Sequence, residues 1–474
     1  MSTISSDHPL SAAGEALPRR ILGLREAIAL IVGIVVGAGI FKAPAIVAGL
    51  IGRSDWMFAV WILGGLISVI GALCYAELAT AYPSAGGDYH FLYRAYGRSV
   101  AFLFGWARLS VITTGSIALL SFVFGDYMAH VLPLGQFGMG MEPLVYAVLA
   151  ILVLTLVNRF NVRTGMAAQT WLTLLQAFSL LLIIGTAAFL IVSPTGIEAG
   201  ITHVRPALET AAPTFSAFGL AMVFVLLTYG GWNESAYISA EVRGGRHSLL
   251  YALILSILII TVLYIFVNWA YWSGLGLRGM AQSNAVAADL LRMAFGPAAE
   301  KLISVMVAIS ALTSINATII VGARTSYAMG RDWPVLSILG VWDGKRDTPV
   351  NALWIQCAGA LLLVFAGYWI GGGFKSMVEF TAPVFWFFFL LAGISLFVLR
   401  IREPDTLRPF RVPFYPVLPF LFCMTCTYML YSSLSYVYDQ SLGGINAAWI
   451  GVIVLAIGVL LLLLVRSVRQ KEVS

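Results

Sequence analysis

VGAGIF (residues 36–41) and TYGGWN (228–233) interrupt two long apolar runs of this chain, the first and the sixth. A glycine inside a helix costs about 1 kcal/mol relative to alanine, and neighbouring glycines let the backbone leave helical angles. In hydrocarbon, the amides and carbonyls that such a break exposes are tolerated only where they line a cavity or bind a ligand. Either cluster alone also fits close helix packing through small residues.

The composition indicates that the apolar runs lie in a membrane. Hydrophobic residues make up 60% of the 474 residues and charged residues only 11%, whereas about a quarter of a soluble domain is charged. These values exclude a soluble enzyme, a disordered protein and a secreted disulfide scaffold. The net charge of +6 comes from short basic clusters between apolar runs. Membrane lipid is therefore an expected partner and nucleic acid is not.

The apolar runs predict an all-α integral membrane protein with twelve transmembrane helices of about 20 residues each. The expected helices are 24–50, 56–81, 99–125, 143–158, 166–193, 213–241, 248–273, 298–322, 351–370, 377–399, 412–437 and 444–465. Most of the 28 Lys and Arg residues fall in loops on one side. The positive-inside rule then places both termini on the cytoplasmic side of the plasma membrane, which in a bacterium is the inner membrane.

The two interrupted runs occupy matching positions, as the first helices of runs one to five and six to ten. Because five is odd, the second set is inverted relative to the first, and such a pair of breaks indicates the binding site of a secondary transporter. A half-helix N-terminus offers free N–H groups and a C-terminus free carbonyls, which suit a small zwitterion or anion. The expected organisation is a disordered cytoplasmic N-terminus (1–23), two inverted repeats (24–193 and 213–400), two further helices (408–466) and a cytoplasmic tail (467–474).

Further motifs accompany the two breaks. They are GALCYAEL (71–78), SAGGDY (84–89), YGGWN (229–233) with Glu241, Ser314-Ile315-Asn316, Arg324 with Gly330-Arg331-Asp332, and RPFRVPFYPVLP (408–419). On these residues, the chain resembles the amino acid–polyamine–organocation (APC) superfamily of permeases, and most closely its L-type amino acid transporter branch. The resemblance covers most of the chain. It implies the 5+5 inverted-repeat (LeuT-type) fold with helices 1 and 6 unwound, and amino acid transport without a cofactor.

The resemblance also implies a substrate site at the breaks. The substrate carboxylate would meet the N–H groups of Ala38, Gly39 and Ile40, and its ammonium would meet the carbonyls of Val35, Leu227 and Gly230. The same segments contain Gly37, Tyr229 and Gly231, and the ring of Trp232 would close one side. Polar side chains of the third and eighth runs are further candidates for the pocket: Thr113, Thr114, Ser116, Ser314 and Asn316. The aromatic stretch FWFFF (385–389) is expected to be packing or lipid-facing material.

The chain departs from the family pattern at several positions. Gln176 replaces a lysine that many relatives carry in the fifth span, so a proton-carrying lysine is absent there. The Gln176 amide can donate a hydrogen bond to a first-span carbonyl and accept one from the eighth span. Residues 126–142 lack the cysteine through which animal relatives bind a glycoprotein, so no disulfide-linked accessory subunit is expected. Leu227 stands at the family's usual aromatic gate.

Ionisable side chains inside the spans are candidates for gating and coupling. Arg108 stands where relatives often have an acid, about 15 Å deep. It needs a carboxylate partner, either Glu77, Glu234 or Glu241, in an inner-gate ion pair; direct substrate contact is the alternative. Glu234 lies near the midplane and is a candidate proton carrier or a static helix-cap or ion-pair residue. Lys42 either lines an outer vestibule or extends along the first span to the interface.

These features predict a secondary active transporter for neutral amino acids, because neither an acid nor a basic cluster surrounds the breaks. Exchange and proton-coupled symport both stay open, with protons as a candidate second partner, and Gln176 favours exchange. A nutrient receptor on a transporter fold is the alternative from another class. An enzyme or metal site is not expected, because all five histidines lie outside the apolar runs and the four cysteines lie within them. A channel would need a repeated filter motif.

Overall fold

The computed structural model describes residues 23–84, 87–135, 141–160, 166–193, 212–233, 245–344, 348–440 and 447–473. These residues form helices, apart from connecting segments and an isolated β-bridge between Asp343 and Thr348. Within these described ranges, ten helices are long and apolar enough to cross a membrane. They are α3 (Ser54–Ala81), α5 with α6 (Arg98–Val131), α7 (Glu142–Arg159), α8 (Met166–Val192), α12 (Gly245–Gln282), α14 (Pro297–Asp332), α15 (Val350–Ile370), α16 (Phe374–Arg402), α17 (Val417–Gln440) and α18 (Ala447–Val473).

The first apolar run is broken where the glycines predict. Helix α1 (Leu24–Val35) ends before Gly37, whose backbone is extended (φ −120°, ψ −173°). A 3₁₀ turn (Ala38–Phe41) follows, and α2 (Ala43–Ile51) then begins with Pro44 in its first turn. Proline fits there because the first N–H groups of a helix have no intrahelical acceptor. The run therefore consists of two half-helices joined by non-α-helical backbone.

The sixth run also ends its helix at the predicted glycines. Helix α10 (Phe215–Thr228) is followed by a turn in which the Gly230 N–H donates to the Leu227 carbonyl at 3.0 Å. Gly231 has φ of 102°, in the left-handed region that favours glycine. At 14 residues, α10 is shorter than the roughly 20 residues of a full span. The rest of the expected 213–241 helix lies outside the described residues.

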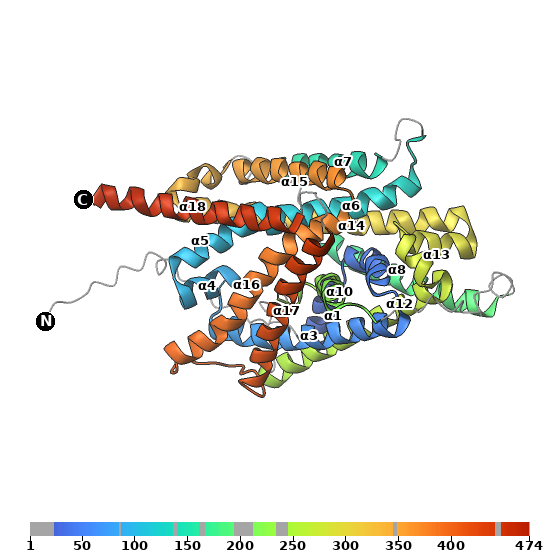
Figure 1. Ribbon diagram of the computed structural model, residues 1–474, viewed down its shortest axis with the longest axis horizontal. Coiled ribbons are helices and arrows are strands. Elements are labelled where there is room, and N and C mark those ends of the chain that lie inside the picture. Colours follow the sequence, from blue (N-terminus) through green and yellow to red (C-terminus); the bar gives the residue numbers. More distant parts are fainter. Residues whose placement is uncertain are drawn as a thin grey trace.

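The two breaks lie against each other in the middle of the bundle, where Figure 1 shows α1 and α10 surrounded by longer helices. A Cβ atom added to Gly39 would lie 3.3 Å from Thr228 Oγ1 and 3.4 Å from Thr228 Cα. The buried Tyr264 of α12 lies with its hydroxyl 3.2 Å from the Thr228 carbonyl oxygen and 3.4 Å from the Val35 carbonyl oxygen. Tyr264 thus holds the ends of both half-helices, a role that the sequence did not suggest.

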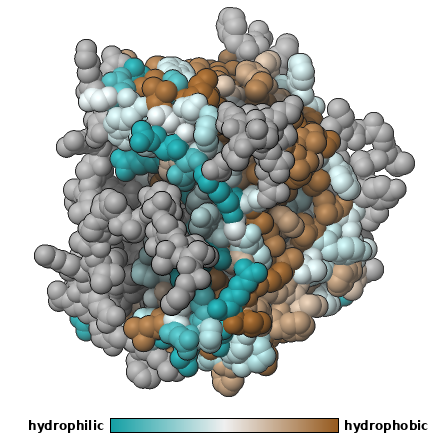
Figure 2. All heavy atoms as spheres, turned by 90° about the vertical axis from the view of Figure 1, so that its left-hand side faces the viewer, coloured by the Kyte–Doolittle hydropathy of each residue, from teal (hydrophilic) through white to brown (hydrophobic). Residues whose placement is uncertain are grey.

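Arginines gather at one end of the bundle, which we call the arginine-rich end. They are Arg94, Arg98, Arg159, Arg331, Arg400, Arg402, Arg408 and Arg411. Figure 2 looks onto this end and shows hydrophilic residues gathered there beside an apolar flank. The opposite end is formed by the segments around Arg53, Leu132, Gly296 and Gly371. The two ends thus face away from each other along the helices, as expected for a spanning bundle.

Two shorter helices lie at these ends. One of them is α13 (Val286–Phe295), which buries Val286, Leu290 and Leu291 and packs on α14 and α8. At the arginine-rich end, the aromatic connection 82–98 contains α4 (Asp88–Tyr96). Several long helices differ from their expected bounds. Helix α12 continues to Gln282, α14 to Asp332 and α18 to Val473, and α17 begins only at Val417, because residues 403–416 form a non-helical connection.

Candidate substrate cavity at the helix breaks

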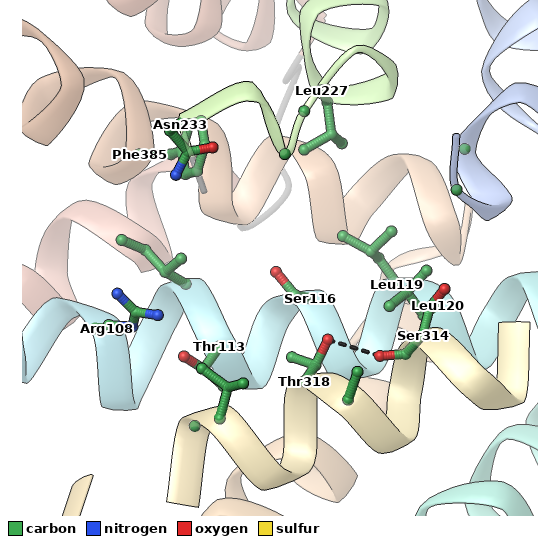
Figure 3. A pocket seen from close by; sticks show the side chains of 18 of the residues that line it. Arg108, Thr113, Ser116, Leu119, Leu120, Leu227, Asn233, Ser314, Thr318 and Phe385 are labelled. Atoms are coloured by element: carbon green, nitrogen blue, oxygen red, sulfur yellow. Dashed lines mark hydrogen bonds between the residues drawn. The ribbon is translucent and has the colours of Figure 1, made fainter. Parts of the chain in front are cut away.

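A cavity of about 360 Å³ lies between the two breaks and the helices α6, α14 and α16. This volume lies within the range of small-molecule sites, about 300–1,000 Å³. From the breaks it is lined by Val35, Gly37, Ala38, Gly39, Leu227, Thr228, Gly230, Gly231 and Asn233. From the surrounding helices it is lined by Tyr75, Asp88, Phe104, Arg108, Ile112, Thr113, Ser116, Leu119, Leu120, Ser314, Ala317, Thr318, Val321, Gly322, Phe374, Phe385, Phe388 and Phe389. Figure 3 shows side chains from α6, α14, α16 and the α10 break around it.

The first break presents backbone donors at this cavity. Within the described part of the chain, the N–H groups of Ala38 and Gly39, the first two of the 3₁₀ turn, have no backbone acceptor. Such N–H groups at a helix start form an anion site. Val35 and Leu227 also line the cavity, and their carbonyls already accept from the Tyr264 hydroxyl and the Gly230 N–H, respectively. Each carbonyl keeps a second lone pair, which an ammonium could use.

Four predicted site residues are not among those that line the cavity. Ile40 and Tyr229 are fully buried, and the Tyr229 hydroxyl donates to the Trp61 carbonyl at 3.0 Å. Trp232 packs against Tyr75 at 5.3 Å between ring centroids, so it supports the wall from behind. The side chain of Asn316 accepts a hydrogen bond from Asn158 of α7 at 2.6 Å. Val35, Gly37, Ala38, Gly39, Leu227, Gly230, Gly231 and Ser314 do line it.

The aromatic stretch 385–389 differs from its expected role. Phe385, Phe388 and Phe389 of α16 line the cavity, whereas we expected packing or lipid contact for the whole stretch. Thr113 and Ser116 also line it, while Thr114 does not. Most of the wall is therefore aromatic and aliphatic, with a few hydroxyl groups.

Gln176 lies in α8 and is 7% exposed. Its Nε2 donates to Ser310 Oγ of α14 at 2.5 Å. The amide therefore donates to the eighth apolar run, where we expected it to accept, and the described contacts do not include a bond to a first-run carbonyl. A neutral hydrogen bond holds α8 against α14 at this position.

Arg108 lies at the wall of the cavity, and Glu77, one of its three candidate partners, does not pair with it. Glu77 is bound elsewhere: it accepts from Arg400 Nε at 2.7 Å and from the Val412 N–H at 2.6 Å, and Arg408 Nε lies 3.7 Å away. This ion cluster fastens α3 to α16 and to the connection before α17. The other two candidates, Glu234 and Glu241, lie outside the described residues.

A second cavity, of about 430 Å³, lies toward the opposite end. Lys42 lines it, and Lys42 Nζ donates to Asp126 Oδ2 at 2.5 Å and to the Asn284 carbonyl at 2.6 Å. These contacts favour a place for Lys42 in an outer vestibule over an extension along the first span to the interface. The sequence did not indicate its partner Asp126, which lies near the end of an apolar run. Phe374 lines both cavities, and it is 2% exposed. It follows Gly371, Gly372 and Gly373, all with positive φ.

Comparisons with known proteins agree with this architecture. Residues 22–461 match the amino acid permease family. The b(0,+)-type amino acid transporter 1 of Homo sapiens is 30% identical over 414 residues, covering 86% of this chain and 81% of the relative. The large neutral amino acids transporter small subunit 2 of Homo sapiens is 30% identical over 423 residues, covering 87% of this chain and 76% of the relative.

The mouse (Mus musculus) b(0,+)-type transporter gives a similar result, with 29% identity over 417 residues and coverage of 88% of this chain and 83% of the relative. These relatives confirm the resemblance that the motifs indicated. With its long apolar helices, the chain is a multi-pass membrane protein that belongs to the amino acid permease family of the APC superfamily, and its relatives include L-type amino acid transporters.

Proposed function

We propose that this protein is a secondary active transporter that exchanges neutral L-amino acids across the membrane by alternating access. The observation that carries the proposal is the cavity at the two breaks, whose lining includes Ala38 and Gly39, with N–H groups that have no backbone acceptor, and Val35 and Leu227, with carbonyls that could accept from an ammonium. A carboxylate and an ammonium on one carbon satisfy both sets of groups. The names of the relatives, as amino acid transporters, support the same substrate class.

The apolar wall supports neutral side chains. Leu119, Leu120, Phe385 and Phe388 line the cavity, and their contact with an aliphatic substrate side chain is worth about 25 cal/mol per Å² of buried apolar surface. Among the lining residues, the described carboxylate is that of Asp88, which begins α4 at the arginine-rich end and lies away from the breaks. Among the described residues that line the cavity beside the breaks, none offers a carboxylate to a cationic side chain.

Two cavities separated by Phe374 support alternating access. The central cavity extends toward the arginine-rich end as far as Asp88, Phe104 and Arg108. Toward the opposite end it stops at Phe374, beyond which the second cavity begins. We infer an inward-facing state in which Phe374 and the Lys42–Asp126 ion pair close the outer route. Movement of Phe374 on the three preceding glycines then opens the outer route.

The finer architecture is part of the same proposal. It comprises twelve transmembrane helices in a bacterial inner membrane. Residues 24–193 and 213–400 form two inverted repeats, and residues 408–466 form two further helices. The short termini (1–23 and 467–474) lie on the cytoplasmic side. The arginine-rich end agrees with that orientation. Because Gln176 and Ser310 are neutral, transport does not need a proton at this position. We therefore favour exchange over proton symport. Glu234 is the candidate proton carrier if symport operates.

The test is counterflow with the purified protein alone in liposomes loaded with each of the twenty amino acids in turn. We expect neutral amino acids inside to accelerate uptake of the same labelled amino acid from outside, without an accessory subunit. If a transport-competent preparation loses activity on purification and regains it only with a co-purifying membrane protein, the independence from a subunit is wrong. Saturable binding without any counterflow would instead identify a nutrient receptor.

A further inference from the structure

We propose that the connection between α16 and α17 is a binding site for an anionic phospholipid, whose phosphate meets Arg402 and Arg411 and whose acyl chains lie along α17. The proposal goes beyond amino acid transport and does not depend on it. The connection, residues 403–416, lies at the arginine-rich end. Figure 1 shows it at the outer edge of the bundle, between the ends of α16 and α17.

The connection directs large apolar side chains outward. Leu407 is 82% exposed and Phe414 is 80% exposed, and Ile401, at the end of α16, is 78% exposed. Single exposed apolar residues are ordinary, but a group of them marks a contact with a membrane or a partner. At the end of two membrane-spanning helices, such a group lies at the level of the lipid headgroups, where apolar and aromatic side chains act as anchors.

The same apolar surface continues along α17. This helix exposes Val417, Phe420, Leu421 and Met424, whose spacing places them on one helical face. The Val417 N–H donates to the Phe414 carbonyl at 2.8 Å, so the connection leads directly into that face. An exposed apolar face on a spanning helix is covered by acyl chains, which makes a lipid the partner of the connection as well.

Two arginines give this edge a preference for a phosphate. Arg402 and Arg411 are both exposed. The Arg402 Nη1 donates to the Ala95 carbonyl at 2.8 Å, a contact that positions the side chain and uses one of the five N–H groups of its guanidinium. Arginine binds phosphate through two parallel hydrogen bonds. The two guanidinium groups thus lie where the phosphate of a lipid that covers α17 would be.

The acids of the connection leave this edge positive. Glu403 forms an ion pair with Arg94 at 2.8 Å, and Asp405 is exposed in the connection. Arg402 and Arg411 therefore outweigh Asp405 by one charge. A positive edge favours a lipid with a net negative headgroup over a zwitterionic lipid.

The site is formed before the lipid arrives. Val412 is 4% exposed, and it fastens the chain beside the exposed Arg411. Phe414 has φ of 51°, a conformation that a bulky residue adopts only where its surroundings hold it. The neighbouring ring of Tyr415 is held by Arg400, whose Cζ lies 3.7 Å from the ring centroid. The backbone therefore presents Arg411 and Phe414 in a fixed arrangement.

The experiment is native mass spectrometry of the purified full chain in detergent, with equal amounts of phosphatidylglycerol and phosphatidylcholine of the same acyl chains. We expect the most tightly retained lipid to be phosphatidylglycerol. Arg411→Gln should lower the ratio of the two retained lipids about fivefold, and Arg402→Gln with Arg411→Gln about 25-fold. Arg411→Lys should keep most of the ratio, because the charge remains. Phe414→Ser should reduce the retention of both lipids and leave their ratio unchanged.

Arg324→Gln is the matched control, because Arg324 is an exposed arginine of α14. It should leave the ratio unchanged, and the melting temperatures of all variants without added lipid should stay close to that of the wild type. An unchanged ratio in the double variant, or an equal decrease in Arg324→Gln, would overturn the proposal. Complete displacement of phosphatidylglycerol by millimolar inorganic phosphate would also overturn it, since that result identifies a site for a free anion. A wild type without counterflow would contradict the proposed transport and leave this lipid site unaffected.

Discussion

Adding a methyl group at Gly37 tests whether the ligand lies against the first break. The nearest atom to a Cβ at Gly37, outside its immediate surroundings, is the Val35 carbonyl oxygen at 3.9 Å, and its φ of −120° is open to any residue. Gly37→Ala should therefore leave the melting temperature of the purified protein unchanged. Gly37 lines the cavity, so the methyl group occupies ligand space. At an overpacking cost of about 1–3 kcal/mol, it should weaken binding about 5- to 150-fold.

Gly39 provides the contrasting case, because its neighbours are protein atoms. A Cβ there would lie 3.3 Å from Thr228 Oγ1 and 3.4 Å from Thr228 Cα and Cγ2. Gly39→Val should thus weaken binding and also lower the melting temperature by forcing the two breaks apart. Replacing Thr228 by alanine in a Gly39→Ala background removes two of those atoms and should recover stability.

A scintillation proximity assay with the labelled neutral amino acid measures the affinity, and thermal unfolding measures the stability. Gly185→Ala is the control, since a Cβ at Gly185 meets nothing within 4 Å and Gly185 does not line the cavity. It should preserve both values. Wild-type affinity in both Gly37→Ala and Gly39→Val would refute the placement of the substrate at the breaks.

Three further outcomes follow from the contacts of the bundle. Phe374→Ala, which removes the ring between the two cavities, should raise leak of labelled substrate from liposomes without exchange partner, whereas Phe374→Tyr should not. Glu77→Gln leaves Arg400 without its carboxylate in a buried site and should cost about 3–5 kcal/mol, seen as a lower melting temperature, while Glu403→Gln at an exposed pair should cost at most about 1 kcal/mol. The rate of exchange should not change between about pH 5.5 and 7.5, because Gln176 does not titrate. Accumulation of substrate driven by a pH gradient would instead establish proton symport, if Glu234→Gln abolishes that accumulation while exchange survives.

The breaks were predictable because glycine acts through local backbone geometry. VGAGIF and TYGGWN place adjacent or alternate glycines inside apolar runs, and the structure ends a helix at each of them. Ten of the twelve predicted spans also appear as long apolar helices among the described residues, since hydrophobicity over about 20 residues is a strong and local signal. Local signals of this kind need no knowledge of what the segment packs against.

Side-chain partners were harder to predict because they depend on which helices meet. Glu77 seemed available to Arg108, but it binds Arg400, 323 residues later in the chain. Asn316 was a plausible pocket residue on a polar stretch, yet rotation of α14 directs it to Asn158. Phe385 and its neighbours looked like packing material, because no sequence pattern separates an aromatic wall of a cavity from an aromatic wall of a core. The position of Phe374 between the two cavities had a possible sequence signal, the three consecutive glycines that precede it.

The contacts of Tyr264 indicate how the site could switch its access from one side of the membrane to the other. Its hydroxyl reaches both the Thr228 carbonyl of α10 and the Val35 carbonyl of α1, so one side chain of α12 holds both half-helices of the proposed substrate site. A substrate ammonium that donates to the second lone pair of the Val35 carbonyl shares that oxygen with the Tyr264 hydroxyl and weakens a bond that is already long, at 3.4 Å. Substrate binding at the first break then weakens the contact between Tyr264 of α12 and α1. A rigid α12 can move relative to α1 only when that contact is weakened. The position thus offers a physical route by which an occupied site changes its access while an empty site stays closed, which is the requirement for obligatory exchange.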